Sequence, residues 1–97
     1  MSEPTEHTLL QRARDGQRDA FGHLQAALEA PARRFVRRLI GKSDAEDDIV
    51  QNAFFALYLN LERLDEGEKL RPFLFRVLRN QCYDELRRQG RYETVSF

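Results

Sequence analysis

The chain has 97 residues with 16 acidic and 16 basic side chains, and 41% of it is hydrophobic, which is enough for one modest core in one domain. Its single cysteine excludes an internal disulfide and a zinc site built on several cysteines. No apolar run approaches the roughly 20 residues that span a membrane, and the polar, acidic N-terminus is not a signal peptide, so we expect a cytoplasmic protein.

The N-terminal part of the sequence predicts a short helix after a disordered lead-in. Residues 1–7 hold a proline and acids without periodicity, which is typical of a disordered terminus. Thr8 can cap a helix over residues 9–15, and Gly16 follows at the position that glycine favours after a helix.

A long helix is predicted next, over residues 19–40, and Gly41 ends it. Pro31 interrupts the pattern. Because proline lacks a backbone donor and clashes with the carbonyl four residues earlier, we expect a kink or a break near Ala30. The apolar positions of this helix are Phe21, Leu24, Leu28, Phe35, Leu39 and Ile40. Its second half carries arginines on the expected solvent side, either as an ordinary solvated face or as an extra phosphate or partner contact: Arg33, Arg34, Arg37 and Arg38.

A capping box predicts the start of a third helix, in which Ser43 accepts from the backbone of the third helical residue and Glu46 bonds back. Acids fill its first turn, where the helix dipole favours negative charge. Phe55, Tyr58 and Leu59 widen its apolar surface beyond one core face, so we expect it to be deeply buried or shared with a partner. Its core stripe is predicted to be Ile49, Val50, Ala53, Phe54, Leu57, Leu61 and Leu64.

The last predicted helix begins near Arg71, is closed by Gly90, and has two different faces. The apolar face is spaced to cover a core, with Phe75, Leu78, Cys82 and Leu86 flanked by Leu74 and Val77. The other face groups cations with an amide and a phenol: Arg76, Arg79, Asn80, Tyr83 and Arg87. Residues 69–91 have a net charge of +5, whereas residues 1–68 have a net charge of −4. A basic helix with interleaved aromatic rings in an otherwise acidic chain indicates a nucleic-acid surface.

No strand-like alternation occurs in the sequence, so the predicted fold is all-α. We expect a small bundle of three main helices with a short N-terminal helix. The helical domain is expected to span residues 8–91, and residues 92–97 are expected to be a tail or the onset of a linker.

Three stretches of the sequence resemble a known family: Ala45–Phe54 (AEDDIVQNAF), Leu70–Asn80 (LRPFLFRVLRN) and Asp84–Arg88 (DELRR). Over residues 9–91 the chain resembles conserved region 2 of bacterial RNA polymerase sigma factors, most closely the extracytoplasmic-function (ECF) subgroup. The stretches form two blocks, residues 45–54 and residues 70–88. Two blocks at the family's spacing are a far more specific signal than one short motif.

The resemblance implies two partners, core RNA polymerase and promoter DNA, and allows an anti-sigma factor as a third. The third helix is expected on the clamp coiled coil of the largest polymerase subunit, through Asp47, Asp48, Gln51, Phe54, Phe55 and Tyr58. The last helix is expected on the non-template strand of the promoter −10 region, through Lys69, Arg71, Arg76, Arg79, Asn80, Tyr83, Arg87 and Arg88. The loop over residues 64–69 resembles the loop that captures a flipped base.

The sequence also departs from the family pattern. Asn52 stands where an acid is usual, and Phe73 and Phe75 stand where Trp and Tyr are common, so these rings lack hydrogen-bonding groups. Because aromatic residues at helical spacing usually face a core, both rings are interpreted mainly as core. The resemblance also implies a second sigma domain, a helix-turn-helix that reads the −35 element, and we do not expect these 97 residues to hold it. Because residues 92–97 resemble the onset of a linker, we favour a chain cut at that linker over a natural one-domain protein.

The residues give no support to an enzyme. His7 lies in the expected lead-in, and His23 is alone on its helix without a carboxylate at metal-binding spacing. Asp47 and Asp48 are adjacent and point about 100° apart, and the sequence has neither a glycine-rich phosphate loop nor a nucleophile motif. We therefore predict no catalytic residue, metal or cofactor. The remaining alternative is a non-catalytic helical module that binds a protein through its wide apolar third helix and never contacts DNA.

Overall fold

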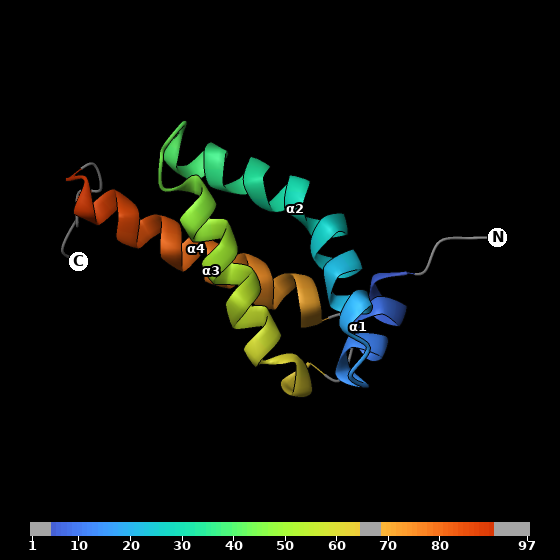
Figure 1. Ribbon diagram of the computed structural model, residues 1–97. Coiled ribbons are helices and arrows are strands. Elements are labelled where there is room, and N and C mark those ends of the chain that lie inside the picture. The colour runs from blue at the N-terminus through green and yellow to red at the C-terminus, as the bar shows by residue number, and fades with distance from the viewer. Residues whose placement is uncertain (1–4, 65–68, 91–97) are drawn as a thin grey trace.

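The computed structural model describes residues 5–64 and 69–90. These ranges form the predicted all-α bundle (Figure 1). Its elements are α1 (Glu6–Arg14), α2 (Arg18–Ile40), α3 (Glu46–Leu59), a 3₁₀ turn η1 (Leu61–Arg63) and α4 (Leu70–Arg88). Helices α2 and α3 both pack on α4, and α1 lies against the first part of α2 (Figure 1). Within the described ranges, no helix is long and apolar enough to cross a membrane.

Helix α1 begins earlier than the sequence predicts. Thr5, rather than Thr8, is the N-cap, and its side-chain oxygen accepts a hydrogen bond from the backbone N–H of Thr8 at 3.1 Å. The expected lead-in over residues 1–7 is therefore wrong for Glu6 and His7, which lie in the first turn of α1, while residues 1–4 lie outside the described part of the chain. Both threonines have the chemistry of an N-cap. The observed hydrogen bond from the Thr8 N–H identifies Thr5 as the cap.

Helix α2 runs without a break through Pro31, so of the two outcomes expected there the break is wrong. Its ribbon instead changes direction near the middle (Figure 1). Proline leaves the carbonyl of Ala27 without its intrahelical donor, and because Ala27 is exposed, water can satisfy that carbonyl. Gly41 ends the helix with φ of +72°, a conformation that favours glycine, and its N–H donates to the Arg37 carbonyl.

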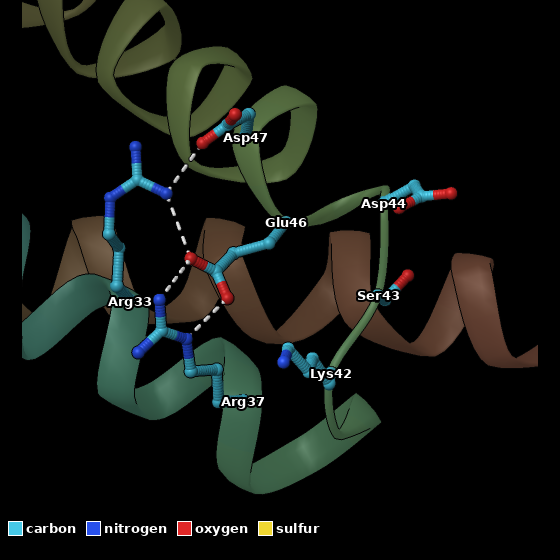
Figure 2. A pocket seen from close by; sticks show the side chains of 7 residues that line it. All are labelled: Arg33, Arg37, Lys42, Ser43, Asp44, Glu46 and Asp47. Atoms are coloured by element: carbon cyan, nitrogen blue, oxygen red, sulfur yellow. Dashed lines mark hydrogen bonds and ion pairs between the residues drawn. The ribbon is translucent and has the colours of Figure 1, made fainter.

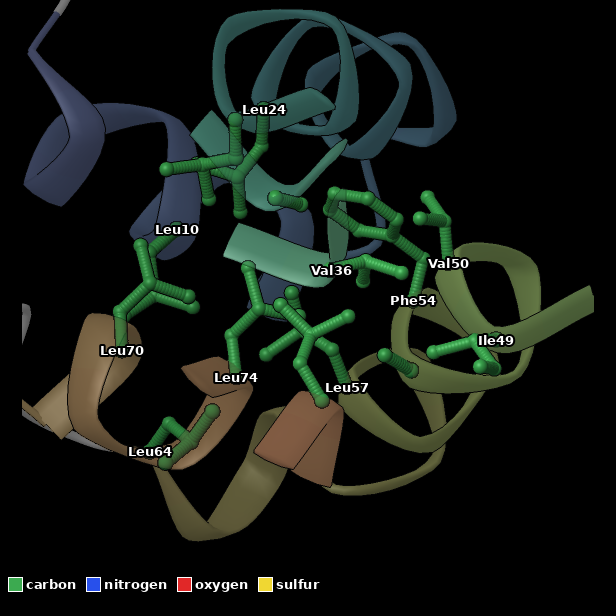
Figure 3. Packing of buried hydrophobic residues seen from close by; sticks show 14 of the residues in the cluster. Leu10, Leu24, Val36, Ile49, Val50, Phe54, Leu57, Leu64, Leu70 and Leu74 are labelled. Atoms are coloured by element: carbon green, nitrogen blue, oxygen red, sulfur yellow. The ribbon is translucent and has the colours of Figure 1, made fainter. Parts of the chain in front are cut away.

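One hydrophobic core lies between the four helices, and side chains from all of them meet in it (Figure 3). The core stripe predicted for the third helix is confirmed, since all seven of its residues are buried. Helix α3 nevertheless ends at Leu59, and Leu61 and Leu64 of the stripe lie in η1 and at its C-terminal cap. In α4 the buried stripe is Leu70, Leu74, Leu78 and Cys82, so the predicted stripe is right at Leu78 and Cys82 and displaced at its ends.

Phe75 and Leu86 lie at the edge of this stripe and are only partly buried. The displacement has a physical reason, because α2 and α3 approach α4 from two sides and the residues facing the line between them become fully buried. Phe75 packs instead against Phe35 of α2, with ring centroids 5.1 Å apart in an edge-to-face arrangement. Helical spacing alone predicts how wide an apolar face is. It does not predict which residues of that face become the most deeply buried.

Candidate functional site

The outer face of α3 carries exposed apolar side chains in a small protein. Phe55, Tyr58 and Leu59 are 62%, 57% and 64% exposed. Asp48 and Gln51 are exposed on the same helix, nearer its N-terminus. The expectation that α3 is shared with a partner is consistent with this surface, which runs from acidic at the helix start to apolar at its end.

Phe54 does not belong to this outer face. It is 2% exposed and packs in the core, so the structure places it behind the surface that a partner could contact. Its role as a contact residue stays a prediction: the ring is buried in the free domain, although Phe54 also lines the floor of a hollow between α2 and α3. Figure 3 shows its ring among Val36 and Val50 of the core cluster.

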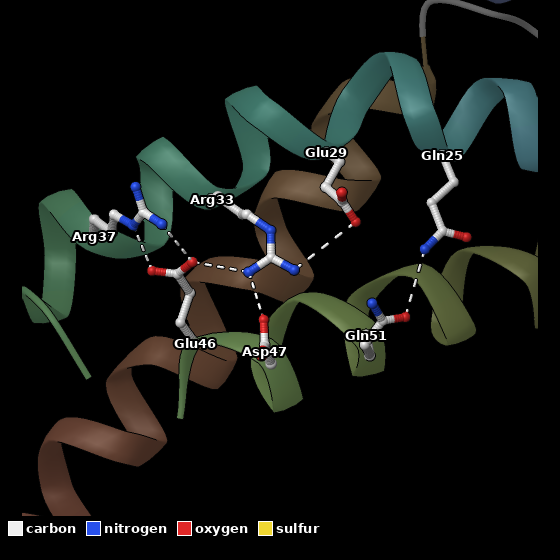
Figure 4. Close-up of polar contacts among 7 residues, drawn as sticks. All are labelled: Gln25, Glu29, Arg33, Arg37, Glu46, Asp47 and Gln51. Carbon is white, nitrogen blue, oxygen red and sulfur yellow. Dashed lines mark hydrogen bonds and ion pairs between the residues drawn. The ribbon is translucent and has the colours of Figure 1, made fainter. Parts of the chain in front are cut away.

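The first half of α2 contributes to the same face, which the sequence did not indicate. The ring of Phe21 meets that of Tyr58 with centroids 5.3 Å apart in an edge-to-face contact. The Gln25 amide donates to Gln51 Oε1 across the two helices at 3.5 Å (Figure 4). These residues, with Phe55, line a shallow hollow between α2 and α3. The sequence identifies Phe21 only as an apolar position of its helix. Its partial exposure on this face depends on where α3 packs, which the sequence does not reveal.

A carboxylate that the sequence assigned to a capping box instead joins α2 to α3. Glu46 Oε1 accepts from Arg37 Nε at 2.6 Å, and Glu46 Oε2 accepts from Arg33 Nη1 at 2.8 Å and Arg37 Nη2 at 3.1 Å (Figure 4). The predicted capping box is wrong, because Ser43 Oγ accepts from the Ala45 N–H and Glu46 does not bond back. Figure 2 shows the hollow that these side chains line.

Charge and burial both act on Glu46, whose side chain is 11% exposed. The hydrogen bond from Arg37 lowers the pKa of this carboxyl, burial opposes the shift, and the hydrogen bond from Arg33 lowers it further. Arg33 also donates to Asp47 Oδ1 at 2.6 Å. Arg33 and Arg37 thus bind acids of the same chain, and Arg37 remains 61% exposed while it does so.

The basic face predicted on α4 is exposed. Arg76, Arg79, Asn80 and Arg87 are exposed, and Tyr83 is half-buried beside them. The structure therefore brings these five side chains to one surface, on the side of α4 away from the core.

Phe73 lies at the base of this basic face, partly buried against the core. The Arg76 guanidinium carbon is 5.8 Å from the centre of its ring, a cation–π contact. The interpretation of Phe73 as mainly core is consistent with this position, and its ring also supports the cation above it.

Three of the cations predicted at this surface have carboxylate partners within the chain. Arg71 binds Glu6 of α1, with Nη2 to Oε1 at 2.6 Å and Nε within 3.2 Å of both oxygens. At the other end of α4, ion pairs form within the helix, Arg87 with Asp84 and Arg88 with Glu85. The basic face is therefore strongest in the middle of α4 and weaker at both ends.

The Sigma-70 region 2 family matches residues 24–92, a range that contains α3, α4 and most of α2. The chain belongs to the Sigma-70 region 2 family. The resemblance based on residues 45–54, 70–80 and 84–88 is thus confirmed.

Curated relatives of this sigma region 2 chain are sigma factors themselves. RNA polymerase sigma factor NccH of Alcaligenes xylosoxydans xylosoxydans is 39% identical over 89 residues, covering 87% of this chain and 46% of that protein. ECF RNA polymerase sigma factor SigW of Bacillus subtilis is 25% identical over 80 residues, covering 82% and 43% respectively. RNA polymerase sigma factor CarQ of Myxococcus xanthus is 29% identical over 80 residues, covering 82% and 46%. The chain spans less than half the length of these relatives, and no solved structure matches it significantly.

Other expectations for the region 2 chain concern single residues. Burial raises the pKa of the Cys82 thiol to about 11, which identifies a structural thiol rather than a reactive one. His23 is exposed, and the described residues contain no group of three or more potential metal-ligating side chains. In the expected base-capturing loop, Leu64 is buried and Lys69 exposed, and residues 65–68 lie outside the described part of the chain.

Proposed function

We propose that this chain is the region 2 domain of a sigma factor that binds core RNA polymerase and the promoter −10 element. The observation that carries the proposal is the presence of two exposed faces of opposite character on one core. The face of α3 is acidic and apolar, whereas the face of α4 is basic and aromatic. A single domain can therefore hold a protein with one helix and a nucleic acid with the other.

The α3 face has the chemistry of a protein contact. Asp48 is exposed at the acidic end, where it can attract a basic partner and speed docking. Phe55 and Tyr58 supply large exposed rings, the residue type that anchors interfaces. We assign this face to the clamp coiled coil of the largest polymerase subunit. Asp47 takes a smaller part, because Arg33 already binds one of its oxygens.

The α4 face has the chemistry of a single-stranded DNA contact. Arg76 and Arg79 can neutralise phosphates, which positions a protein on DNA. Tyr83 offers a ring on which an unstacked base can lie, a contact worth roughly 1–3 kcal/mol per base. Asn80 can donate and accept in one plane, as reading a base edge requires. We assign this face to the non-template strand of the −10 element.

The salt dependence of strand binding tests the DNA part of the proposal. The slope of log affinity against log salt for a −10 oligonucleotide is expected to fall by about 0.7 in magnitude for each phosphate contact removed. Arg79→Gln should lower the slope by that amount. Arg34→Gln, an exposed arginine of α2 that makes the same change in net charge, should leave it unchanged.

A response independent of salt would contradict the DNA assignment. It would favour the alternative of a sigma-like module that binds only protein.

Replacing Asn80 and Tyr83 together by alanine should abolish strand binding while the helical circular dichroism signal and polymerase docking persist, because neither side chain belongs to the buried core.

A further inference from the structure

Helix α1 contacts the chain on both sides of the junction between η1 and α4. At its C-terminal end, Arg14 Nη2 donates to the Glu62 carbonyl of η1 at 3.3 Å. At its N-terminal end, Glu6 binds the Arg71 guanidinium through both carboxylate oxygens. The Arg14–Glu62 contact joins residues 48 positions apart in sequence, and the Glu6–Arg71 contact joins residues 65 positions apart. Both are therefore tertiary contacts, which the helix does not require for its own formation.

Apolar packing connects these two polar contacts. Leu10 of α1 is fully buried, and Figure 3 shows it beside Leu70, the first residue of α4. Leu64, the last described residue before the junction, is buried in the same cluster. The Arg14 Nε is buried without a hydrogen-bond partner within the described residues, so this side chain is held into the bundle rather than left in solvent. Helix α1 therefore contacts described residues on both sides of the junction, and we call this arrangement a brace.

Arg71 is paired with a carboxylate of its own chain while this brace is formed. Glu6 engages two of the five N–H donors of its guanidinium, Nε–H shared between both carboxylate oxygens and one Nη2–H, and the carboxylate offsets the charge that would attract a phosphate. The hydrogen bond from Glu6 also raises the pKa of Arg71. The pair is in part exposed, with 50% of the Arg71 side chain and 33% of the Glu6 side chain accessible. A carboxylate at this distance neutralises the cation that the sequence assigned to DNA.

We propose that α1 positions the N-terminal end of α4 for strand binding, through Glu6 and Arg14, and that Arg71 is a positioning residue rather than a DNA contact. This inference rests on the proposed function, because the turns that α1 holds lead directly into Phe73 and Arg76. It concerns a part of the chain that lies before the range matched by the family, which begins at residue 24.

Strand binding by single variants separates positioning from contact. If Arg71 positions α4, both Glu6→Gln and Arg71→Gln weaken binding by about twofold to fivefold, the range of a partly exposed ion pair, and leave the salt slope unchanged. If Arg71 contacts a phosphate, Arg71→Gln lowers the slope by about 0.7 while Glu6→Gln tightens binding by releasing the arginine. The second pattern would overturn the proposal.

The charge-swapped variant Glu6→Arg with Arg71→Glu provides a rescue. Positioning requires only that the pair be restored, so the swap should recover most of the affinity lost in each single variant. A swap that binds more weakly than Arg71→Gln would contradict positioning, since a carboxylate would then stand where DNA needs a cation.

Hydrogen exchange tests the brace without DNA. Glu6→Gln should speed exchange at the Leu64 and Leu74 amides, on the two sides of the junction, and leave the Ile49 amide of α3 unchanged. Unaltered exchange at Leu64 and Leu74 would refute the brace. If the wild-type chain fails to bind the strand, the proposed function of α4 fails, whereas the exchange result still decides whether α1 holds its end.

Discussion

Glu46 accepts hydrogen bonds from two arginines one helical turn apart on α2, and this arrangement fixes the start of α3. Arg33 and Arg37 are spaced i, i+4, so both guanidinium groups can reach one carboxylate. The sequence contains this signal, because two cations at that spacing are followed by an acidic helix start. A capping box also needs a glutamate at this position, and only the observed geometry shows that Glu46 binds the arginines instead.

Replacing Glu46 by glutamine should lower the free energy of unfolding by about 1–2 kcal/mol, because the amide offers one acceptor where the carboxylate accepts charge-assisted bonds on both oxygens. Urea unfolding followed by circular dichroism measures this. Asp44→Asn, an exposed acid of the preceding turn, is the matched control and should have a much smaller effect. Equal stability of Glu46→Gln and wild type would show that the Arg33–Glu46–Arg37 contacts do not stabilise the fold.

The same carboxylate predicts an acid-sensitive part of the stability. The pKa of Glu46 is lowered in the folded protein from its ordinary value of 4.5, so its contribution is fully present above that value. As pH falls from 4.5 through the lower folded pKa, protonation removes the contribution. Unfolding free energies measured between pH 7 and pH 3 should therefore converge for wild type and Glu46→Gln, and a difference that stays constant over that range would be contrary evidence.

At the scale of elements, the buried face of α3 is predicted from sequence correctly, whereas its cap and its end, and the buried faces of the neighbouring helices, are predicted with specific errors. The apolar stripe of α3 is broad, and acidic residues mark the start of the helix. Together they predict a single buried face. In α4 two apolar strips lie side by side, and the packing of α2 and α3 decides that Leu74 rather than Phe75 is central. In α2 the proline pattern permits a kink or a break, and the core contacts on both sides of Pro31 keep the helix continuous.

The α2 helix also contains a glycine that its structure does not require. Gly22 is helical and exposed, and a Cβ added there would meet nothing within 4 Å. Gly22→Ala should raise the unfolding free energy by about 0.5–1 kcal/mol by restricting the unfolded chain. Gly41→Ala is the opposite case, because φ of +72° is strained for alanine, and it should be destabilising. Thermal unfolding of both variants checks the pair, and destabilisation by Gly22→Ala would argue against the helix as described there.

At the scale of the whole molecule, the candidate surfaces depend on the bundle more than on any motif. The sequence predicts that Arg76, Arg79 and Asn80 share a surface, because one helix is enough to bring them together. It could not predict that Phe21 joins the α3 face or that Glu6 binds Arg71, since each depends on how distant helices pack. It also could not predict the burial of Phe54, because a motif records residue types without their burial.

Retention of core RNA polymerase by the immobilised 97-residue chain at moderate salt tests the central claim most directly. We predict that the wild-type chain retains the polymerase and that Asp48→Lys, a charge reversal on an exposed acid of α3, loses it with helicity unchanged. Arg79→Gln on α4 should retain it as the wild type does. A well-folded wild-type chain that fails to retain the polymerase, or equal retention by Asp48→Lys, would contradict the assignment of the α3 face.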